Sequence, residues 1–351
     1  MKEYDLVIVT NVAAFYKVNL FNLLSRKIRL KVIFISKKSK IRNDDFYNFN
    51  MKFDHAFIND KDFEERSPFK TLLGVMKEIS NIKYNRMIYP GWEIKELFIL
   101  SLLINKKKNS VVIESSINES NMHGVTGFLK KLYLNRMDSA YPAGFLQNKI
   151  LESVGFKGRA YFTHGVGIIN TQVRKTIKKD THDDVIQPLK YVYVGRLSDE
   201  KNLILLVNVF NELNLPLVII GTGPQEEELK SLANGNVFFK GYVHNYELSH
   251  FLYECDVFIL PSISEPWGLV IDEALAVGMP VILSNKVGCH RDLVNNDNGI
   301  VFDPYDAECL KSAIYRMEHE YPKFKKGALD YRVEESNELQ IKAYVESIKN
   351  T

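Results

Sequence analysis

Two glutamates stand eight residues apart where the sequence changes from a strand pattern to a helix pattern. Residues 257–260 form a short apolar run, which predicts a buried strand that stops at a sheet edge. Apolar residues recur at three- and four-residue steps from Leu269, which predicts a helix that Gly278 ends. Glu265 therefore lies in the loop, and Glu273 lies about two helical turns further along the chain.

This strand-to-helix loop could seat an anion. Backbone amides at a helix N-terminus bind phosphate, and Gly268 would let the backbone approach it closely. A phosphate held there would have one carboxylate beside it and a second one deeper in the pocket. The alternative is a capped amphipathic helix with two solvated acids, because glutamates begin many helices.

Two cations follow another predicted strand, at residues 191–194. Arg196 and Lys201 lie between that strand and an apolar helix, and both can converge on one side of the loop. Facing a diphosphate, they would neutralise the charge that grows on a leaving group. The alternative is a pair of surface cations at a helix start, where the helix dipole disfavours them.

Both segments resemble a known enzyme family. Residues 262–278 resemble the E-x7-E signature of the retaining group 1 glycosyltransferases (glycosyltransferase family 4), and residues 195–202 resemble the family's GRL-x-x-EK-N segment. The residues that carry the first match are Glu265, Pro266, Gly268, Leu269, Glu273, Ala274 and Gly278. The resemblance implies an α/β protein of the GT-B fold, with two Rossmann-like doubly wound domains facing a central cleft.

The resemblance also implies roles for single residues. Glu265 would contact the donor sugar, Glu273 would hydrogen-bond the ribose, and the catalytic candidates are Glu265, Arg196 and Lys201. We give Glu265 no nucleophile role, because the leaving phosphate could itself act as the base. The remaining donor-binding candidates are Gly195, Pro266, Trp267, Gly268, Leu269, Gly221, Tyr242 and Val243. The donor would be a UDP- or GDP-sugar, and no metal or other cofactor is expected.

The first half of the chain opens with a strand, a helix and a strand, which is typical of a doubly wound sheet. Residues 15–21 resemble the first loop of bacterial polysaccharide members of the family, which faces the acceptor and the donor phosphates; an ordinary helix N-terminus is the alternative. The acceptor-side candidates are Tyr16, Lys17, Gly91, Glu114, Ser115 and His123. Many family members have a histidine near position 114, so Glu114 is a departure.

The string Asp60-Lys61-Asp62 has the spacing that metal-dependent sugar transferases of another fold use. No strong strand pattern precedes it, so we predict a solvated loop and no metal site.

A length of 351 residues favours two domains. We place an N-terminal Rossmann-like acceptor-binding domain at residues 1–175, a polar linker at 176–190, and a C-terminal Rossmann-like nucleotide-sugar-binding domain at 191–335. The resemblance implies that the last helix, residues 336–351, crosses back to the N-terminal domain.

The net charge of +3 conceals an uneven distribution. Residues 1–179 carry 31 basic and 16 acidic side chains, whereas residues 180–351 carry 15 basic and 27 acidic ones. This asymmetry suggests an anionic partner for the first half. The candidates are an anionic membrane surface and nucleic acid; a solvated rim that offsets the acidic half is the alternative.

Other features indicate where the protein works. The longest apolar run, residues 97–104, is far shorter than the roughly 20 residues that span a bilayer. We expect no signal peptide, because charged residues near the start precede only a strand-length apolar run. The cysteines at 255, 289 and 309 form neither a disulfide framework nor a metal spacing. We therefore expect a cytoplasmic protein, peripheral on the cytoplasmic face of the inner membrane.

The resemblance implies a retaining, metal-independent glycosyltransferase, and the basic first half suggests a role in bacterial surface polysaccharide synthesis. It would move a sugar from a nucleotide-diphosphate sugar to a lipid-linked saccharide acceptor of an O-antigen, capsule or exopolysaccharide. A nucleotide-sugar 2-epimerase of the same fold is the alternative enzyme. A nucleic-acid-binding module fits less well, because aromatic and basic residues do not interleave at a known motif spacing.

Overall fold

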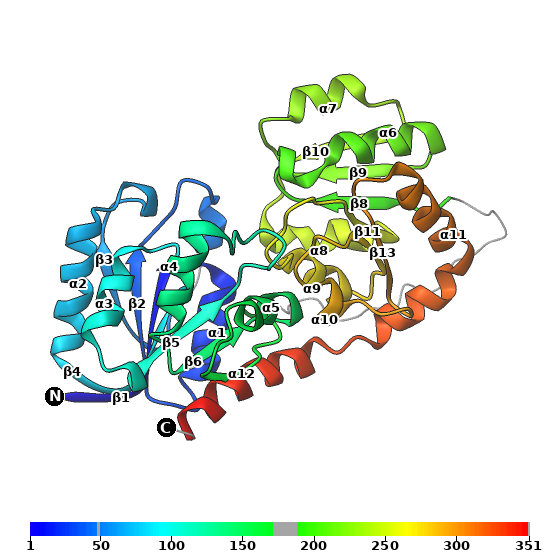
Figure 1. Cartoon of the computed structure of the whole chain (residues 1–351). Coiled ribbons are helices and arrows are strands. Elements are labelled where there is room, and N and C mark those ends of the chain that lie inside the picture. The colour runs from blue at the N-terminus through cyan, green and yellow to red at the C-terminus, as the bar shows by residue number, and fades with distance from the viewer. Residues whose placement is uncertain (48–49, 171–187, 350–351) are drawn as a thin grey trace. The chain divides into compact units, whose positions relative to one another are not determined.

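The computed structural model of the chain describes residues 1–47, 50–170 and 188–349 (Figure 1). The chain divides into two compact units, one made of Met1–Ile169 with Glu334–Thr351 and the other of Asn170–Val333. The predicted linker at residues 176–190 lies outside the described residues as far as residue 187.

The first unit is built on a seven-stranded parallel sheet with the strand order β3-β2-β1-β4-β5-β6-β7. Its strands are β1 (Lys2–Val12), β2 (Leu30–Ser36), β3 (Asp54–Asn59), β4 (Ile82–Tyr89), β5 (Asn109–Ile113), β6 (Ser139–Pro142) and β7 (Arg159–Ala160). Its α-helices are α1 (Phe15–Leu24), α2 (Pro68–Ser80), α3 (Glu96–Leu103), α4 (Gly124–Leu134), α5 (Phe145–Ser153) and α12 (Val333–Lys349). Short 3-10 helices lie at η1 (Asp44–Tyr47), η2 (Phe63–Glu65) and η3 (Lys106–Lys108).

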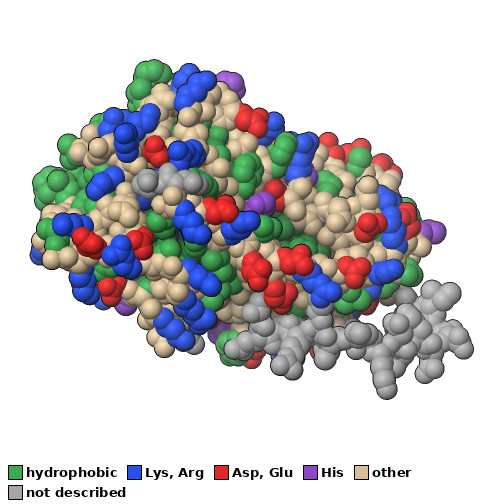
Figure 2. Space-filling model, turned by 90° about the horizontal axis from the view of Figure 1, so that it is seen from below, with side chains coloured by type: hydrophobic (Ala, Val, Ile, Leu, Met, Phe, Trp, Pro, Cys, Tyr) green, Lys and Arg blue, Asp and Glu red, His purple; other side chains and the backbone are tan. Residues whose placement is uncertain are grey.

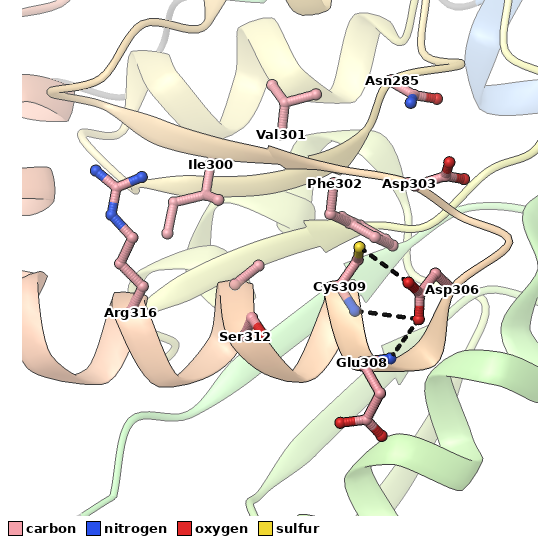
Figure 3. Close-up of a pocket in the computed structure, with 11 residues that line it drawn as sticks. Asn285, Ile300, Val301, Phe302, Asp303, Asp306, Glu308, Cys309, Ser312 and Arg316 are labelled. Carbon is pink, nitrogen blue, oxygen red and sulfur yellow. Dashed lines mark hydrogen bonds between the residues drawn. The ribbon is translucent and has the colours of Figure 1, made fainter.

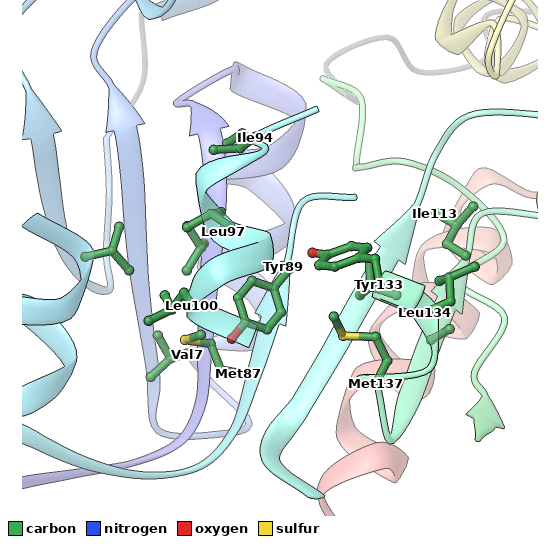
Figure 4. Close-up of a cluster of buried hydrophobic side chains, with 14 of the residues drawn as sticks. Val7, Met87, Tyr89, Ile94, Leu97, Leu100, Ile113, Tyr133, Leu134 and Met137 are labelled. Atoms are coloured by element: carbon green, nitrogen blue, oxygen red, sulfur yellow. The ribbon is translucent and has the colours of Figure 1, made fainter. Parts of the chain in front are cut away.

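Other elements cover both faces of the central strands of this sheet. The side chains on both faces of these strands are therefore apolar. On one face, Val7 and Met87 of neighbouring strands pack with Leu97 of α3 and Leu134 at the end of α4 (Figure 4). The alternate residues of β1 belong to a second core, together with the side chains of α1. Burial on both faces explains why β1 and β2 are nearly continuous apolar runs.

The last helix, α12, packs on the first unit. Tyr344 stacks on Tyr141 of β6 with ring centroids 5.0 Å apart and an interplanar angle of 12°. Gln340 Nε2 donates to the carbonyl oxygen of Gly167 at 3.3 Å, and Ser336 Oγ donates to that of His164 at 3.2 Å. Helix α12 therefore belongs to the first unit and contributes to its hydrophobic core.

The second unit is built on a six-stranded parallel sheet with the order β10-β9-β8-β11-β12-β13. Its strands are β8 (Tyr191–Val194), β9 (Leu217–Ile220), β10 (Val237–Gly241), β11 (Val257–Leu260), β12 (Val281–Ser284) and β13 (Gly299–Phe302). Its helices are η4 (Asp199–Lys201), α6 (Leu203–Leu213), α7 (Glu226–Leu232), α8 (Asn245–Tyr253), α9 (Leu269–Ala276), α10 (His290–Leu293) and α11 (Ala307–Asp330). The chain builds the sheet outwards from β8 in one direction and then from β11 in the other, so the order reverses between these two strands.

One premise about Asp60 needs correction. The sequence showed no strong strand pattern ahead of it, yet β3 ends at Asn59, directly before it; Asp60 itself lies outside the strand, in the predicted solvated loop. This strand lies at the edge of the sheet and has no fully buried residue, which explains its weak apolar pattern. Asp60 is exposed and pairs with Lys37 at 2.7 Å.

Within the described ranges, no helix is both long enough and apolar enough to cross a membrane.

Candidate functional site

The residues expected to grip a diphosphate lie where the strand order of the second sheet reverses. Arg196 and Lys201 follow β8, and Glu265 follows β11, its direct neighbour. Loops at the carboxyl ends of such neighbouring strands diverge to opposite sides, which makes this place the usual ligand site of an open parallel sheet. The topology therefore brings together segments that are about 65 residues apart in the sequence.

Lys201 and Glu265 form an ion pair across these two loops. Lys201 Nζ donates to Glu265 Oε2, and the side chains are only 16% and 17% exposed. The backbone joins the same loops, since the amide of Ile263 donates to the carbonyl oxygen of Glu200 at 2.9 Å. A third loop, after β12, closes on the other side, where the amide of Gly288 donates to the carbonyl oxygen of Glu265 at 2.9 Å.

Arg196 is exposed at the same loop. Tyr193 of β8 donates its hydroxyl to the carbonyl oxygen of Arg196 at 2.9 Å. Burial acts to raise the pKa of Glu200, but a hydrogen bond from Ser198 and the charges of Lys201 and Arg196 outweigh it and lower that pKa. Arg196 and Lys201 thus both help to lower the pKa of the Glu200 carboxyl. Both cations lie in the loop after β8, which pairs with Glu265.

Glycines let neighbouring loops of this site approach backbone to backbone. A Cβ on Gly221 would lie 1.9 Å from the carbonyl oxygen of Gly195, and the φ of Gly221 is +136°. The amide of Gly221 also donates to the carbonyl oxygen of Gly241 at 2.8 Å. The loops after β8 and β9 are therefore in direct contact where a side chain would not fit, and the end of β10 is hydrogen-bonded to the loop after β9.

Gly268 sets the start of α9. Its φ of +97° is in the left-handed region that favours glycine, and α9 begins at the next residue, Leu269. Pro266 lies in the same loop, whose backbone is held by a bond from the amide of Cys289 to the carbonyl oxygen of Trp267 at 3.0 Å. The predicted anion seat is thus a fixed loop ahead of a helix N-terminus.

The Trp267 side chain lies inside the unit. It is 2% exposed, and its indole N–H donates to Asp272 Oδ2 at 3.0 Å. Tyr331, just after α11, donates to the other oxygen of Asp272 at 3.4 Å. Burial raises the pKa of Asp272 to about 7, although both hydrogen bonds act to lower it. Sequence reasoning did not single out Asp272, because the E-x7-E match drew attention to Glu273 beside it.

Glu273 lies on α9 and is partly exposed. Burial raises its pKa to about 7; a hydrogen bond from Asn245 at the start of α8 acts to lower that pKa, and the charge of Asp272 raises it further. The Cys289 thiol is close enough to both Asp272 and Glu265 for their charges to raise its pKa, in addition to burial. Asp272 and Glu265 therefore both lie near the Cys289 thiol, and Glu273 lies near Asp272.

Tyr242 and Val243 follow β10 at the edge of the sheet. Tyr242 is 38% exposed and meets the ring of His244 edge-on at 5.4 Å, and His244 stacks on Tyr246 at 5.4 Å and 12°. These three rings form an aromatic row after β10, beside the glycine loops.

In the first unit, the structure joins three of the acceptor-side candidates. Lys17 Nζ lies 3.0 Å from Glu114 Oε1, and the Lys17 side chain is 14% exposed. Burial acts to lower the pKa of Lys17, but the Glu114 carboxylate outweighs it, so the pKa is raised. Tyr16 accepts a hydrogen bond at its hydroxyl from Arg42 Nη2 at 3.0 Å. We define Tyr16, Lys17, Arg42 and Glu114 as the first-unit polar cluster.

Arg42 was not among the acceptor-side candidates. Its guanidinium carbon lies 5.4 Å from the ring centroid of Tyr16 and 5.6 Å from that of Phe46. The sequence showed a basic run at residues 37–42, but only the fold shows which of these cations turns inward.

The other three acceptor-side candidates are not joined to the first-unit polar cluster. Gly91 forms a turn after β4 with a φ of +78°, and His123 is exposed directly before α4. In the part of the chain that the structure describes, Gly91, Ser115 and His123 make no hydrogen bond or ion pair with that cluster.

A separate hollow of about 470 Å³ lies between β13 and the start of α11 (Figure 3). None of the predicted site residues lines it. Its Asp306 accepts from the amides of Glu308 at 2.9 Å and Cys309 at 3.4 Å, so this acid caps α11. Among the described residues, no group of three His, Cys, Asp or Glu side chains is arranged to hold a metal ion.

The second unit matches a known family. Residues 175–328 match the family model described as "Glycosyl transferases group 1". The sulfoquinovosyl transferase SQD2 of Arabidopsis thaliana is 35% identical over 135 residues, which cover 37% of this chain and 26% of that protein. The amylovoran biosynthesis glycosyltransferase AmsK of Erwinia amylovora is 30% identical over 151 residues, which cover 38% of this chain and 37% of that protein. The chain thus matches less than half the length of either relative.

Solved structures resemble the folds of both units. Sucrose-phosphate synthase from Thermosynechococcus elongatus superposes with a TM-score of 0.71 at 16% identity, covering 99% of this chain and 96% of that one. Anabaena HepE, solved with UDP and glucose, superposes with a TM-score of 0.68 at 14% identity, covering 99% and 97%. At these identities the likeness shows the fold, and the predicted GT-B fold of two doubly wound parallel sheets is confirmed.

Proposed function

Because residues 175–328 belong to the group 1 glycosyl transferases, we propose that this chain moves a sugar from a nucleotide-diphosphate sugar to a saccharide acceptor. The anomeric configuration of the sugar is retained, and no metal takes part. The observation that carries the proposal is the Lys201–Glu265 pair, which stands beside Arg196 at the switch point of the second sheet.

The chemistry follows from the charges at this loop. Departure of a nucleoside diphosphate builds negative charge on its outer phosphate, and two cations fixed beforehand stabilise that charge without reorganising. The ion pair with Glu265 already fixes the Lys201 side chain, so this side chain does not have to change its conformation during the reaction. Arg196 is exposed, and its planar guanidinium can bind the phosphates through bidentate hydrogen bonds.

The acids bind the organic parts of the donor. Glu265 contacts the sugar, where a carboxylate can orient hydroxyls or stabilise positive charge at the anomeric carbon. Glu273 accepts from the ribose hydroxyls, and the aromatic row at Tyr242 lies along the base. UDP is the first nucleotide to test, because the HepE structure was solved with UDP; GDP is the second.

The acceptor is a lipid-linked saccharide of a bacterial surface polysaccharide. AmsK is named as a glycosyltransferase of amylovoran biosynthesis, which supports a polysaccharide product. The first unit binds the acceptor, and its excess of basic residues suits an acceptor that carries phosphate. On the face shown in Figure 2, Lys and Arg side chains are spread over the first unit, whereas Asp and Glu are more frequent over the second.

The test is a calorimetric titration of the full chain with UDP- and GDP-sugars, followed by transfer assays with the sugar that binds. We expect micromolar to millimolar binding of one of them, transfer to a lipid-linked saccharide in the presence of EDTA, and a product of unchanged anomeric configuration by NMR. An isomerised sugar formed without any acceptor would identify a 2-epimerase and overturn the proposal. An inverted product, or loss of activity in EDTA, would overturn its retaining or metal-free part.

A further inference from the structure

Two helices of the first unit are apolar on their outer faces. On α3, Ile99, Leu102 and Leu103 are 51%, 52% and 65% exposed. On α4, the exposed apolar residues are Val125, Phe128, Leu129 and Leu132, from 39% to 76%. We call these seven side chains the α3–α4 surface. A helix on the surface of a water-soluble domain normally has polar residues on its outer face, so this surface requires an explanation.

The two helices are in contact with each other. The ring of Phe98 on α3 meets that of Tyr133 on α4 edge-on, with centroids 5.6 Å apart. Arg136, just after α4, donates through Nη2 to the carbonyl oxygen of Ile104 at 3.2 Å and to that of Leu102 at 3.5 Å. The inner faces of both helices enter the same core, as Leu97 and Leu134 show in Figure 4. The helices are therefore fixed to each other, and their outer residues cannot turn inward without breaking that core.

Basic side chains flank this apolar area. Lys106, Lys107 and Lys108 form η3, separated by two residues from the end of α3, and are exposed, and Lys131 is exposed on α4. Lys130 lies over the ring of Trp92, with Nζ 4.7 Å from its centroid. From residue 97 to residue 136 the chain has six basic and two acidic residues, and one of the acids, Glu114, is paired with Lys17. The neighbourhood of the α3–α4 surface is therefore positive.

We propose that the α3–α4 surface is a docking face for an anionic lipid bilayer, with its aliphatic and phenyl groups among the acyl chains and its lysines on the lipid phosphates. Apolar residues bordered by lysine are the usual composition of a helix that lies in a membrane interface. A protein partner fits less well, because protein interfaces are enriched in Tyr, Trp and Arg and depleted of Lys. With only eight residues, α3 is too short to cross the bilayer and lies along it.

The inference rests on the proposed function and deepens it. A lipid-linked acceptor remains in the membrane, so the unit that binds it must reach the bilayer surface. Docking through α3 and α4 would place the acceptor-binding unit there without any spanning segment.

The test is sedimentation of the full chain with vesicles of phosphatidylcholine, with or without phosphatidylglycerol, at low and high salt. We expect at least tenfold tighter binding to the vesicles that contain phosphatidylglycerol, and weaker binding at high salt. The double variant Phe128→Asn/Leu129→Asn should lose at least tenfold in binding. Lys106→Gln/Lys107→Gln should lose about fivefold per lysine, only on anionic vesicles.

Matched controls lie in the second unit. Leu232→Asn changes an apolar residue that is 38% exposed on α7, and Lys240→Gln/Lys326→Gln removes two exposed charges. Equal vesicle binding by the α3–α4 variants and these controls would overturn the inference. So would a wild-type dimer that the Phe128→Asn/Leu129→Asn change converts to a monomer, because a second copy would then cover the surface.

The outcome is separable from that of the proposed function. Titration with the donor nucleotide sugar depends on the second unit and should be unchanged in every α3–α4 variant. Donor binding without vesicle binding would remove only the docking face. Vesicle binding by a chain that binds no nucleotide sugar would remove the proposed function instead.

Discussion

Lys201 and Glu265 are 64 positions apart in the chain and form an ion pair that connects the loops after β8 and β11. Each side chain is about five-sixths covered, so neither is as fully solvated as a surface pair. Removing one partner of such a pair leaves a charge in a place that water reaches poorly. The pair therefore fixes the position of a cation at the point where the strand order reverses.

We expect Lys201→Ala to lower the kcat of sugar transfer by about 10²–10³-fold, the usual effect of losing one fixed group that stabilises transition-state charge. The variant should still bind the nucleotide sugar, because Arg196 and the glycine loops remain. Steady-state kinetics with saturating donor measure the loss. Lys230→Ala is the control, since Lys230 is also paired, with Glu226 at 2.8 Å, on α7 of the same unit. If both variants slow transfer equally, Lys201 has no special role.

Glu273 predicts a pH dependence of donor binding. Burial raises its pKa to about 7, so this carboxyl is largely protonated at pH 6 and largely ionised at pH 8. An ionised carboxylate accepts hydrogen bonds from two ribose hydroxyls through its two oxygens. In a protonated carboxyl one of these oxygens carries a proton and acts as a donor instead. Donor affinity should therefore rise between pH 6 and pH 8, and Glu273→Gln should flatten the profile. Calorimetry with an intact nucleotide sugar avoids titration of the ligand, because both of its phosphates are esterified. A slope that Glu273→Gln leaves unchanged would exclude this residue as the source.

Asp272 predicts a pH dependence of stability with the opposite sign. Its pKa is about 7 in the folded unit, against an ordinary value of 3.8, so the folded state binds the proton more tightly than the unfolded state. The stability that this group contributes is fully present below about pH 4 and is lost as pH rises through 7. Asp272→Asn should therefore lose less stability than the wild type between pH 5 and pH 8. The urea midpoint at several pH values measures the difference, and identical losses would contradict the assignment.

Much of the second unit was predictable because its functional loops are short and local. Each of its strands ends in a motif that contains its own signal, such as the glycines at 195 and 221 or the cations at 196 and 201. Once a doubly wound sheet is assumed, these strand ends must meet at one edge. The partner of Lys201 was not predictable in this way, because the pairing of β8 with β11 is a property of strand order and no local pattern encodes it.

The first unit was less predictable because its polar residues are used inside the fold. Arg86, in the middle of β4, is 1% exposed, and its Nη1 donates to Ser110 Oγ at 2.9 Å. Glu96 on α3 is also buried, and it pairs with Arg66 at 3.0 Å. Nothing in the sequence separates such structural charges from Arg42, which joins the first-unit polar cluster. Which charged residue joins a polar cluster depends on how loops that are distant in the sequence are placed in the fold.

Gly221→Ala should disrupt the second unit. Its Cβ would lie 1.9 Å from the carbonyl oxygen of Gly195, and neither atom can rotate away because the backbone fixes the positions of both. We expect a loss of about 1–3 kcal/mol or more in the free energy of unfolding, with loss of donor binding. Gly235→Ala is the control, because a Cβ there would meet no atom within 4 Å. Urea unfolding and nucleotide titration of both variants provide the measurement. A Gly221→Ala protein that is as stable as Gly235→Ala and binds donor normally would contradict this prediction. It would show that the loops after β8 and β9 can move apart without loss of stability or donor binding.

Lys17 should act on the acceptor and leave the donor unaffected. It is paired with Glu114 at 3.0 Å inside the first unit, where Arg42 contributes a second positive charge. Lys17→Met keeps the length of the side chain and removes its charge, so an acceptor phosphate would lose one of two cations. We expect the KM for the lipid-linked acceptor to rise about tenfold, with donor affinity unchanged, since one charge-assisted hydrogen bond contributes about 1.5–3 kcal/mol. Kinetics with varied acceptor measure this, and Lys27→Met, an exposed lysine of the same unit, is the control. A Lys17→Met enzyme with a weaker donor affinity and an unchanged acceptor KM would place Lys17 on the donor phosphates instead.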